Sequence, residues 1–522
     1  MNLHSTSRTA RVPCATARHG RTLGAPEMRP LDLLFTRAAG FPDRVAVRDS
    51  RGDHSYRYLA DRSAQVASGL LAGVSDLAEA RVAYLIPPGI DHVAVQWGAW
   101  KAGGIAVPIA LSHPLREVEY LLDDSQPAIA VTTAALVARL GPAAAKRGIR
   151  LALCEEVGTA PVGPMPVVSA DRRALMVYTS GTTGRPKGVV STHAAIRAQV
   201  TTLAEAWEWT ERDQTLNLLP LHHIHGIINA MSCPLWCGAT VEFAETFDPL
   251  HCWERLASGV ITFFTAVPTI YSRLIDAFGT ADIPTRDRWS AGVRQLRLMM
   301  SGSAALPASV LERWQTITGH RLLERYGMTE IGMALANPLR GERRAGTVGQ
   351  PLPGVAARLV ADVGGQLAID GPGQIEVRSD QMFLEYWNRP DETRQSFRDG
   401  WFATGDVAQV ENGYWRILGR QSVDIIKSAG YKVSALEIEE TFREHPAVED
   451  CAVLGRPDLD LGERIGAVVV LRSDTSADDL RAWLKERLAP YKVPKDFVFI
   501  DDLPRNAMGK VTKTELKRLF DQ

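Results

Sequence analysis

Short apolar runs alternate with amphipathic helical patterns from Leu31 onward. The clearest strand-like runs are residues 81–86, 105–109 and 128–132. Alternation of this kind is typical of α/β units, in which helices cover sheets of largely parallel strands. We therefore expect a large N-terminal α/β domain with mixed and parallel sheets flanked by helices.

The pattern becomes β-rich between Val348 and Gly419. Short strands separated by Gly and Pro turns are expected there, at residues 355–360, 373–377 and 414–418. Such spacing indicates a β-rich subdomain within the large domain.

A third pattern begins after Gly419 and Arg420. Helices are expected at residues 436–445 and 477–488, and strands at 448–454, 465–471 and 497–500. These elements are enough for a separate small α+β domain. The 522 residues are thus predicted to comprise a leader at 1–27, a large N-terminal domain at 28–419 and a small C-terminal domain at 420–522.

The leader is basic and has two interpretations. It carries Arg8, Arg11, Arg18 and Arg21, with no acidic residue before Glu27. This composition fits either a mitochondrial transit peptide or a disordered extension without a defined fold. We expect a cytoplasmic protein, with the mitochondrial matrix as the alternative if the leader is a targeting signal.

Composition excludes several classes of partner. The chain is 45% hydrophobic and 23% charged, with a formal net charge of -1, so it offers no general attraction to nucleic acid or acidic membranes. No apolar stretch is long enough to predict a membrane span. Partners must therefore be inferred from individual sites.

The strongest local motif is the run YTSGTTGRPKG at residues 178–188, which lies between two apolar strand-like runs. Its glycines allow tight turns that aim backbone N–H groups inward, and its hydroxyls and lysine add donors for an anion. It is not a Walker A loop, because Lys187 is not followed by Ser or Thr. The motif predicts a polyphosphate site formed by Thr179, Ser180, Gly181, Thr182, Thr183, Gly184 and Lys187.

Four further motifs accompany this loop in a fixed order. They are YGMTE at 326–330, TGD at 404–406, GR at 419–420 and PRNAMGK at 504–510. Together with the loop they resemble the signatures of the adenylate-forming superfamily, which includes acyl- and aryl-CoA synthetases. The resemblance covers about residues 30–520, and it implies ATP, Mg²⁺ and coenzyme A as ligands.

The resemblance also implies residue roles, each with a physical reason. Glu330 is expected to bind magnesium through its hard carboxylate oxygens, and Thr329 to contact phosphate. Asp406 is expected to accept both ribose hydroxyls, and Arg420 to make a second ribose contact. Ser303, Tyr326, Gly327 and Met328 complete the expected nucleotide site.

The last motif is expected to act in the first half-reaction. Lys510 would bridge the acid's carboxylate and the α-phosphate, since a flexible ammonium suits a moving negative charge. For thioester formation the small domain of the superfamily rotates, and Gly430 would then let the pantetheine arm of CoA pass. Ala429 departs from the common pair of glycines at this turn.

Two arginines indicate the acid. Arg273 and Arg325 fall at expected pocket positions, and a buried arginine without a carboxylate partner is costly. A substrate with a second carboxylate would supply that partner, unless the arginines pair internally with Asp276 or Glu324. His223 is expected at the entrance of the acyl pocket.

The sequence at residues 301–307, 323–334 and 423–437 is similar to that of malonyl-CoA synthetases, especially those of the mitochondrial type. The resemblance therefore implies an ATP-dependent acid–CoA ligase for malonate or methylmalonate. A ligase for medium-chain or aromatic acids is the alternative within this chemistry. A non-catalytic nucleotide-binding regulator is the alternative from another class.

Overall fold

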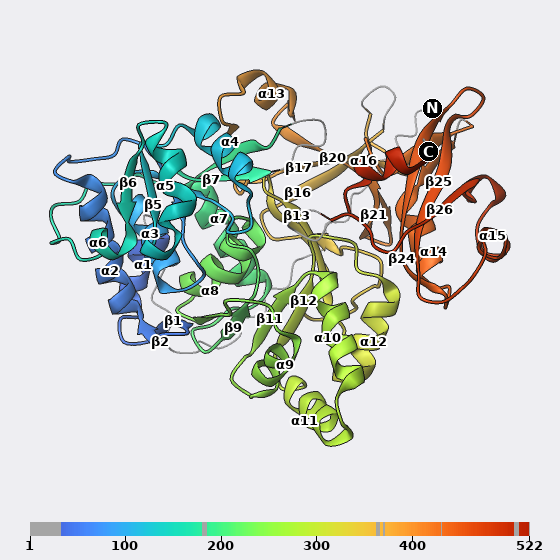
Figure 1. Ribbon diagram of the computed structural model, residues 1–522, viewed down its shortest axis with the longest axis horizontal. Helices are drawn as coiled ribbons and strands as arrows, with labels where there is room; N and C mark the ends of the chain where they lie inside the picture. Colours follow the sequence, from blue (N-terminus) through green and yellow to red (C-terminus); the bar gives the residue numbers. More distant parts are fainter. Residues whose placement is uncertain are drawn as a thin grey trace, which may run out of the picture. The chain divides into compact units, whose positions relative to one another are not determined.

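The computed structural model describes residues 33–179, 185–361, 366–368, 371–429, 431–505 and 511–520. These residues form an α/β protein with four sheets, coloured along the chain in Figure 1. Within these ranges, no helix is both long and apolar enough to cross a membrane.

A seven-stranded sheet carries the phosphate-loop motif. Its strand order is β18-β8-β7-β4-β3-β5-β6, and β7, β4, β3, β5 and β6 run parallel to one another. The expected strands at 81–86, 105–109 and 128–132 are confirmed as β3, β4 and β5. The bounds are β3 Arg81–Leu85, β4 Ile105–Pro108, β5 Ile129–Thr132, β6 Arg150–Leu153, β7 Arg173–Thr179, β8 Lys187–Thr192 and β18 Glu385–Tyr386, with helices α2 Tyr56–Leu71, α3 Ile90–Lys101, α4 Leu115–Ser125, α5 Val137–Ala145 and α6 Cys154–Val157.

A nine-stranded sheet has the order β15-β14-β13-β12-β11-β9-β10-β1-β2. Its strands are β1 Val45–Asp49, β2 Gly52–Ser55, β9 Gln214–Asn217, β10 Thr240–Phe243, β11 Phe263–Ala266, β12 Leu298–Ser301, β13 Leu323–Met328, β14 Gly332–Ala336 and β15 Gln350–Pro351. Further helices of the N-terminal part are α1 Leu34–Arg37, α7 His193–Ala206, the π-helix η3 His225–Ser232, α8 Cys233–Trp236, α9 Pro249–Ala257, α10 Pro268–Thr280, α11 Ile283–Val293 and α12 Ala308–Thr318. Short 3-10 turns lie at η1 Ala38–Gly40 and η2 Ala134–Leu136.

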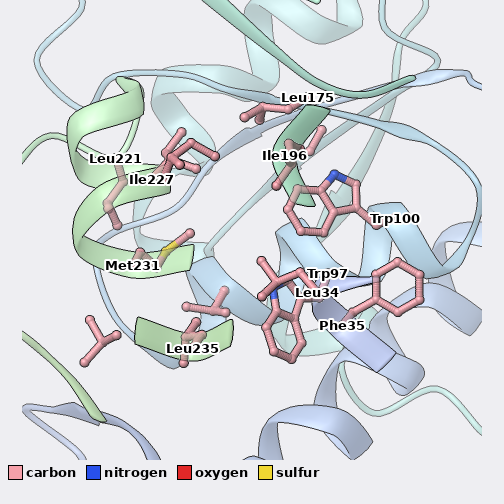
Figure 2. Packing of buried hydrophobic residues seen from close by; sticks show 14 of the residues in the cluster. Leu34, Phe35, Trp97, Trp100, Leu175, Ile196, Leu221, Ile227, Met231 and Leu235 are labelled. Carbon is pink, nitrogen blue, oxygen red and sulfur yellow. The ribbon is translucent and has the colours of Figure 1, made fainter. Parts of the chain in front are cut away.

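The largest core joins elements of both sheets. Figure 2 shows Trp100 of α3 beside Ile196 of α7, with Leu175 of β7 nearby, and the same cluster includes Trp97 of α3 and Ile227 of η3. All five side chains are at most 2% exposed. Burial of so much apolar surface gives the strands that carry the motifs a rigid base.

The β-rich subdomain is confirmed. Its sheet has the order β16-β17-β20-β19, and β21 pairs with β20. The elements are β16 Ala356–Val360, β17 Gly373–Arg378, β19 Phe397–Arg398, β20 Trp401–Glu411, β21 Tyr414–Arg420 and the helix α13 Pro390–Gln395.

The C-terminal segment forms its own mixed sheet and two small hydrophobic cores. Strand β26 is parallel to β25, whereas the other pairs are antiparallel. The elements are β22 Ile425–Ser428, β23 Tyr431–Ser434, α14 Ala435–Arg443, β24 Val448–Asp458, β25 Gly462–Leu471, α15 Ala477–Lys485, η4 Pro490–Lys492, β26 Asp496–Phe499, α16 Lys513–Leu516 and η5 Lys517–Phe520. The α+β character is as predicted, while the boundaries at residues 27 and 419 stay predictions.

Candidate active site

The phosphate-loop motif connects two antiparallel strands. Thr179 at the end of β7 lies opposite Lys187 at the start of β8. The predicted residues Ser180, Gly181, Thr182, Thr183 and Gly184 lie outside the described residues. The far end of the loop is anchored, because the Tyr120 hydroxyl donates to the Pro186 carbonyl at 2.6 Å.

Lys187 and Glu330 lie on either side of one tyrosine. The Lys187 ammonium lies 5.2 Å from the Tyr386 ring centroid and forms an ion pair with Glu392. The Tyr386 hydroxyl donates to Glu330 Oε1 at 2.9 Å. Strand β18 brings Tyr386 here by pairing with β8, where Tyr386 lies opposite Val189.

Glu330 has the chemistry of a magnesium ligand. It is 6% exposed, burial raises the pKa of its carboxyl, and among the described residues no basic side chain forms an ion pair with it. A buried carboxylate without a cation is costly, and a hard divalent ion would offset that cost. The residue therefore fits the predicted role.

The three remaining nucleotide motifs meet at Asp406. The Tyr326 hydroxyl donates to Asp406 Oδ2 at 2.6 Å, and Arg420 Nε donates to Oδ1 at 3.0 Å. Strands β20 and β21 place Asp406 directly opposite Arg420. Each carboxylate oxygen can accept two hydrogen bonds, so one acceptor position on each remains for a ribose hydroxyl.

The turn between β13 and β14 carries Thr329, which is buried. Tyr326, Gly327 and Met328 form the end of β13. A Cβ atom at Gly327 would lie 2.2 Å from the Gly332 carbonyl oxygen, so the hairpin closes only with glycine at that position. Backbone and side chains of this motif are thus held close to Glu330.

Among the described residues, Arg325 is a buried cation without an ion-pair partner. The residue is only 4% exposed, and its Nε and Nη2 atoms have no hydrogen-bond partner. Burial lowers the pKa of the guanidinium to about 10. The alternative of internal pairing with Glu324 is not observed, because the Glu324 carboxylate accepts the Gly346 N–H at 3.3 Å and burial raises its pKa to about 8.

Gly302 and His225 lie near Arg325, and Ser303 is hydrogen-bonded to His225. A Cβ atom at Gly302 would lie 2.2 Å from Arg325 Nη1, so the guanidinium uses space that a side chain there would fill. His225 bonds to Ser303 Oγ at 3.1 Å and to Thr265 Oγ1 at 2.8 Å, and burial holds the pKa of its ring well below the usual value. Ser303 adopts a left-handed backbone with φ of 70°, a strained conformation of the kind that clusters at functional sites.

The burial expected for Arg273 is wrong. Arg273 is exposed on α10, whose buried residues include Tyr271, Leu274 and Ile275. Successive helical residues are about 100° apart, so position 273 falls on the side opposite Tyr271. No ion pair of Arg273 with Asp276 is present among the described residues, and its contact with substrate stays a prediction. His223 is half-buried, with its ring 4.3 Å from that of His222.

Comparison with known proteins assigns the family. The model of the AMP-binding enzyme family matches residues 34–387, and the model of the AMP-binding enzyme C-terminal domain matches residues 437–510. The chain belongs to the AMP-binding enzyme family.

Relatives of this AMP-binding enzyme match over nearly the full chain. A protein of Mus musculus named malonate–CoA ligase ACSF3, mitochondrial, is 44% identical, covering 93% of this chain and 90% of that protein. An Arabidopsis thaliana protein named malonate–CoA ligase is 42% identical, covering 95% and 89%. The ATP-bound structure of MatB from Rhodopseudomonas palustris has a TM-score of 0.86 at 33% identity, covering 94% of this chain and 99% of that one.

Two predicted residues of this AMP-binding enzyme, Gly430 and Lys510, lie outside the described residues. Their neighbours are described: Ala429 has a left-handed φ of 50°, and its N–H donates to the Leu461 carbonyl at 2.8 Å. This turn closes the β22–β23 hairpin, in which Ser428 pairs with Tyr431.

Tyr386, Glu392 and His225 are not among the residues that the sequence predicts for the site. Tyr386 is the last residue of the two-residue strand β18, and Glu392 lies in the helix α13 that follows. No local motif connects either residue with the phosphate loop. His225 was within reach, because it shares the run LHHIHG with His223. The burial of His225, which distinguishes it from the half-buried His223, depends on the tertiary fold.

Proposed function

We propose that this AMP-binding enzyme is an ATP-dependent malonate–CoA ligase. In the first half-reaction one malonate carboxylate attacks the α-phosphorus of ATP, which forms malonyl-adenylate and releases pyrophosphate. In the second, the thiol of CoA attacks the acyl carbon, which forms the thioester and releases AMP. The names of the mouse and Arabidopsis relatives support the choice of acid.

Arg325 is the observation that carries the proposal. A guanidinium buried without an anion is costly, and a monocarboxylic acid would leave it so after its only carboxylate had moved to the adenylate. A dicarboxylic acid keeps a second carboxylate, which can accept two parallel N–H donors from Nε and Nη2. Both of these atoms lack a partner in the structure.

The nucleotide would be held at three points. Lys187 and Thr179 serve the phosphates, since an ammonium and a hydroxyl donate to anionic oxygens. Asp406, already oriented by Tyr326 and Arg420, serves the ribose hydroxyls. Orientation before binding reduces the entropy lost when the nucleotide is bound.

Glu330 and Thr329 would act where charge develops. Magnesium held by Glu330 would neutralise the phosphate oxygens and so ease the approach of the malonate anion. The Tyr386 hydroxyl orients the Glu330 carboxylate by its hydrogen bond. Thr329 donates to phosphate, and Lys510 bridges the carboxylate and the α-phosphate. Ser303, Gly327 and Met328 form the adjoining wall, and Gly430 admits the pantetheine arm.

The decisive experiment is a pyrophosphate-release assay. Malonate, methylmalonate, butyrate, a medium-chain acid and an aromatic acid are compared, each with and without CoA. We expect malonate to support ATP- and CoA-dependent thioester formation well above butyrate. Preference for a monocarboxylic acid would overturn the choice of acid, and no pyrophosphate with any acid would favour a nucleotide-binding regulator.

The mitochondrial names of the animal relatives support a matrix location for this protein over the cytoplasmic one. Basic residues of the leader fit a targeting signal. Fusion of residues 1–27 to a fluorescent protein tests this assignment: import into mitochondria supports it, and a diffuse cytoplasmic signal contradicts it.

A further inference from the structure

A negative charge faces the lysine that the proposed function assigns to phosphate. Glu392, in the first turn of α13, forms an ion pair with Lys187. The Lys187 side chain is 26% exposed and that of Glu392 is 42% exposed. A carboxylate beside a phosphate-binding lysine opposes triphosphate binding, because it both occupies the lysine and repels the ligand.

A second cation lies next to the same carboxylate. Arg389 Nε is 4.0 Å from Glu392 Oε1, too far for a hydrogen bond. That Nε atom is buried and has no hydrogen-bond partner. The rest of the guanidinium is held in place, because Nη2 donates to Asp124 Oδ1 at 3.0 Å and to the Tyr120 hydroxyl at 3.2 Å. An unused donor on a fixed group is therefore within reach of a small rotation of Glu392.

The Glu392 carboxylate can pair with either of two cations, Lys187 or Arg389. In one arrangement, Glu392 is in close contact with Lys187, and Arg389 Nε has no hydrogen-bond partner. In the other, Lys187 turns to a phosphate oxygen and Glu392 moves to Arg389 Nε, so no charge or donor is left alone. Tyr120 connects both sides, since its hydroxyl also donates to the Pro186 carbonyl at the end of the phosphate loop. The loop end and the receiving arginine thus share one anchor.

We propose that Glu392 is a positioning residue that exchanges between two cations: it holds Lys187 when no nucleotide is bound and transfers to Arg389 when Lys187 takes a phosphate. This proposal rests on the proposed function, in which Lys187 contacts the triphosphate of ATP. It adds that the ion pair with Glu392 weakens ATP binding, and that Arg389 limits this loss.

The test is the dissociation constant of ATP, measured by titration calorimetry on the full-length protein with magnesium but without any acid, so that no turnover occurs. Exposed ion pairs contribute about 0.2–1 kcal/mol, so Glu392→Gln is expected to tighten ATP binding about 1.4- to fivefold. Asp391→Asn is the matched control. It removes the same charge from the neighbouring residue, whose ion pair is with Arg394, and it should leave the constant unchanged.

Two double variants, in which Glu392→Gln is combined with Lys187→Met or with Arg389→Lys, test the exchange itself. Lys187→Met should weaken ATP binding, and Glu392→Gln should have no further effect in that background, because the pair no longer exists. Arg389→Lys, which keeps the charge but removes Nε, should weaken binding in the wild-type background and not in the Glu392→Gln background. These three results together would support the exchange.

Other outcomes overturn it. Equal tightening by Asp391→Asn, or tightening that persists with Lys187→Met, would mean a general charge effect rather than a pair. Unchanged or weaker binding with Glu392→Gln, while Lys187→Met still weakens it, would refute the exchange and leave the proposed function standing. Normal ATP binding by Lys187→Met would refute both the exchange and the proposed contact of Lys187 with phosphate.

Discussion

Replacement of Arg325 by methionine separates the effect of the buried charge on the stability of the fold from its role in malonate recognition. Burial lowers the pKa of this guanidinium from its ordinary value to about 10. One pKa unit corresponds to about 1.4 kcal/mol, so the buried charge destabilises the fold by on the order of 3 kcal/mol at neutral pH. The folded-state pKa lies below the unfolded one, so this penalty is complete below about pH 10 and disappears as the pH rises from there toward 12.5.

Arg325→Met is therefore expected to be more resistant to denaturation than the wild type at pH 7. Methionine is flexible and apolar, so it removes the charge while filling most of the space. The same variant should lose activity on malonate. Two hydrogen bonds to a charged carboxylate contribute about 1.5–3 kcal/mol each, so a loss of at least about 3 kcal/mol in total corresponds to a fall in kcat/KM of roughly 100-fold or more.

Two measurements check this prediction. Pyrophosphate release with malonate and with butyrate gives the selectivity, and butyrate activity should stay the same or rise. Urea unfolding with and without malonate gives the stability, and malonate should stabilise the wild type but not the variant. Equal loss with both acids, together with easier unfolding, would show that Arg325 supports the fold and does not recognise substrate.

Three further substitutions test other parts of the site. Arg273→Ala should reduce malonate kcat/KM much less than Arg325→Met, about fivefold or less, because solvent screens an exposed guanidinium; a loss as large as that of Arg325→Met would place Arg273 in the pocket. Ala429→Gly should raise the stability of the C-terminal segment by about 1 kcal/mol in urea unfolding, because glycine relieves the left-handed φ of 50°; a lower midpoint would contradict this. Lys510→Ala should stop adenylate formation from ATP and malonate, while thioester formation from supplied malonyl-adenylate continues; loss of both half-reactions would give Lys510 a structural role.

The sequence predicts the fold where local pattern and tertiary structure agree. The runs at 81–86, 105–109 and 128–132 become β3, β4 and β5 almost residue for residue, since strands buried in a parallel sheet are apolar throughout. The loop between β7 and β8 is placed correctly because glycines and hydroxyls interrupt two apolar strands. Asp406 and Arg420 are paired correctly, because they face each other across one hairpin.

Local sequence patterns do not predict contacts between segments that are distant in the sequence. Tyr386 reaches Lys187 only because β18 adds to the edge of β8, and a two-residue strand has no periodicity to detect. Arg325 is buried, as expected from its predicted pocket position. Arg273 is exposed, contrary to the prediction, because the face of α10 that packs inward carries Tyr271, Leu274 and Ile275, and a pocket motif does not reveal which face that is.

Gly302 and Arg325 compete for the same volume, with a hypothetical Cβ only 2.2 Å from Nη1. A side chain at position 302 therefore requires the Arg325 guanidinium to move from its present place or to be replaced by a smaller group. Once a bulkier residue has settled there, reversion of the arginine alone would no longer fit. A return to the original acid preference would then require substitutions at both positions 302 and 325.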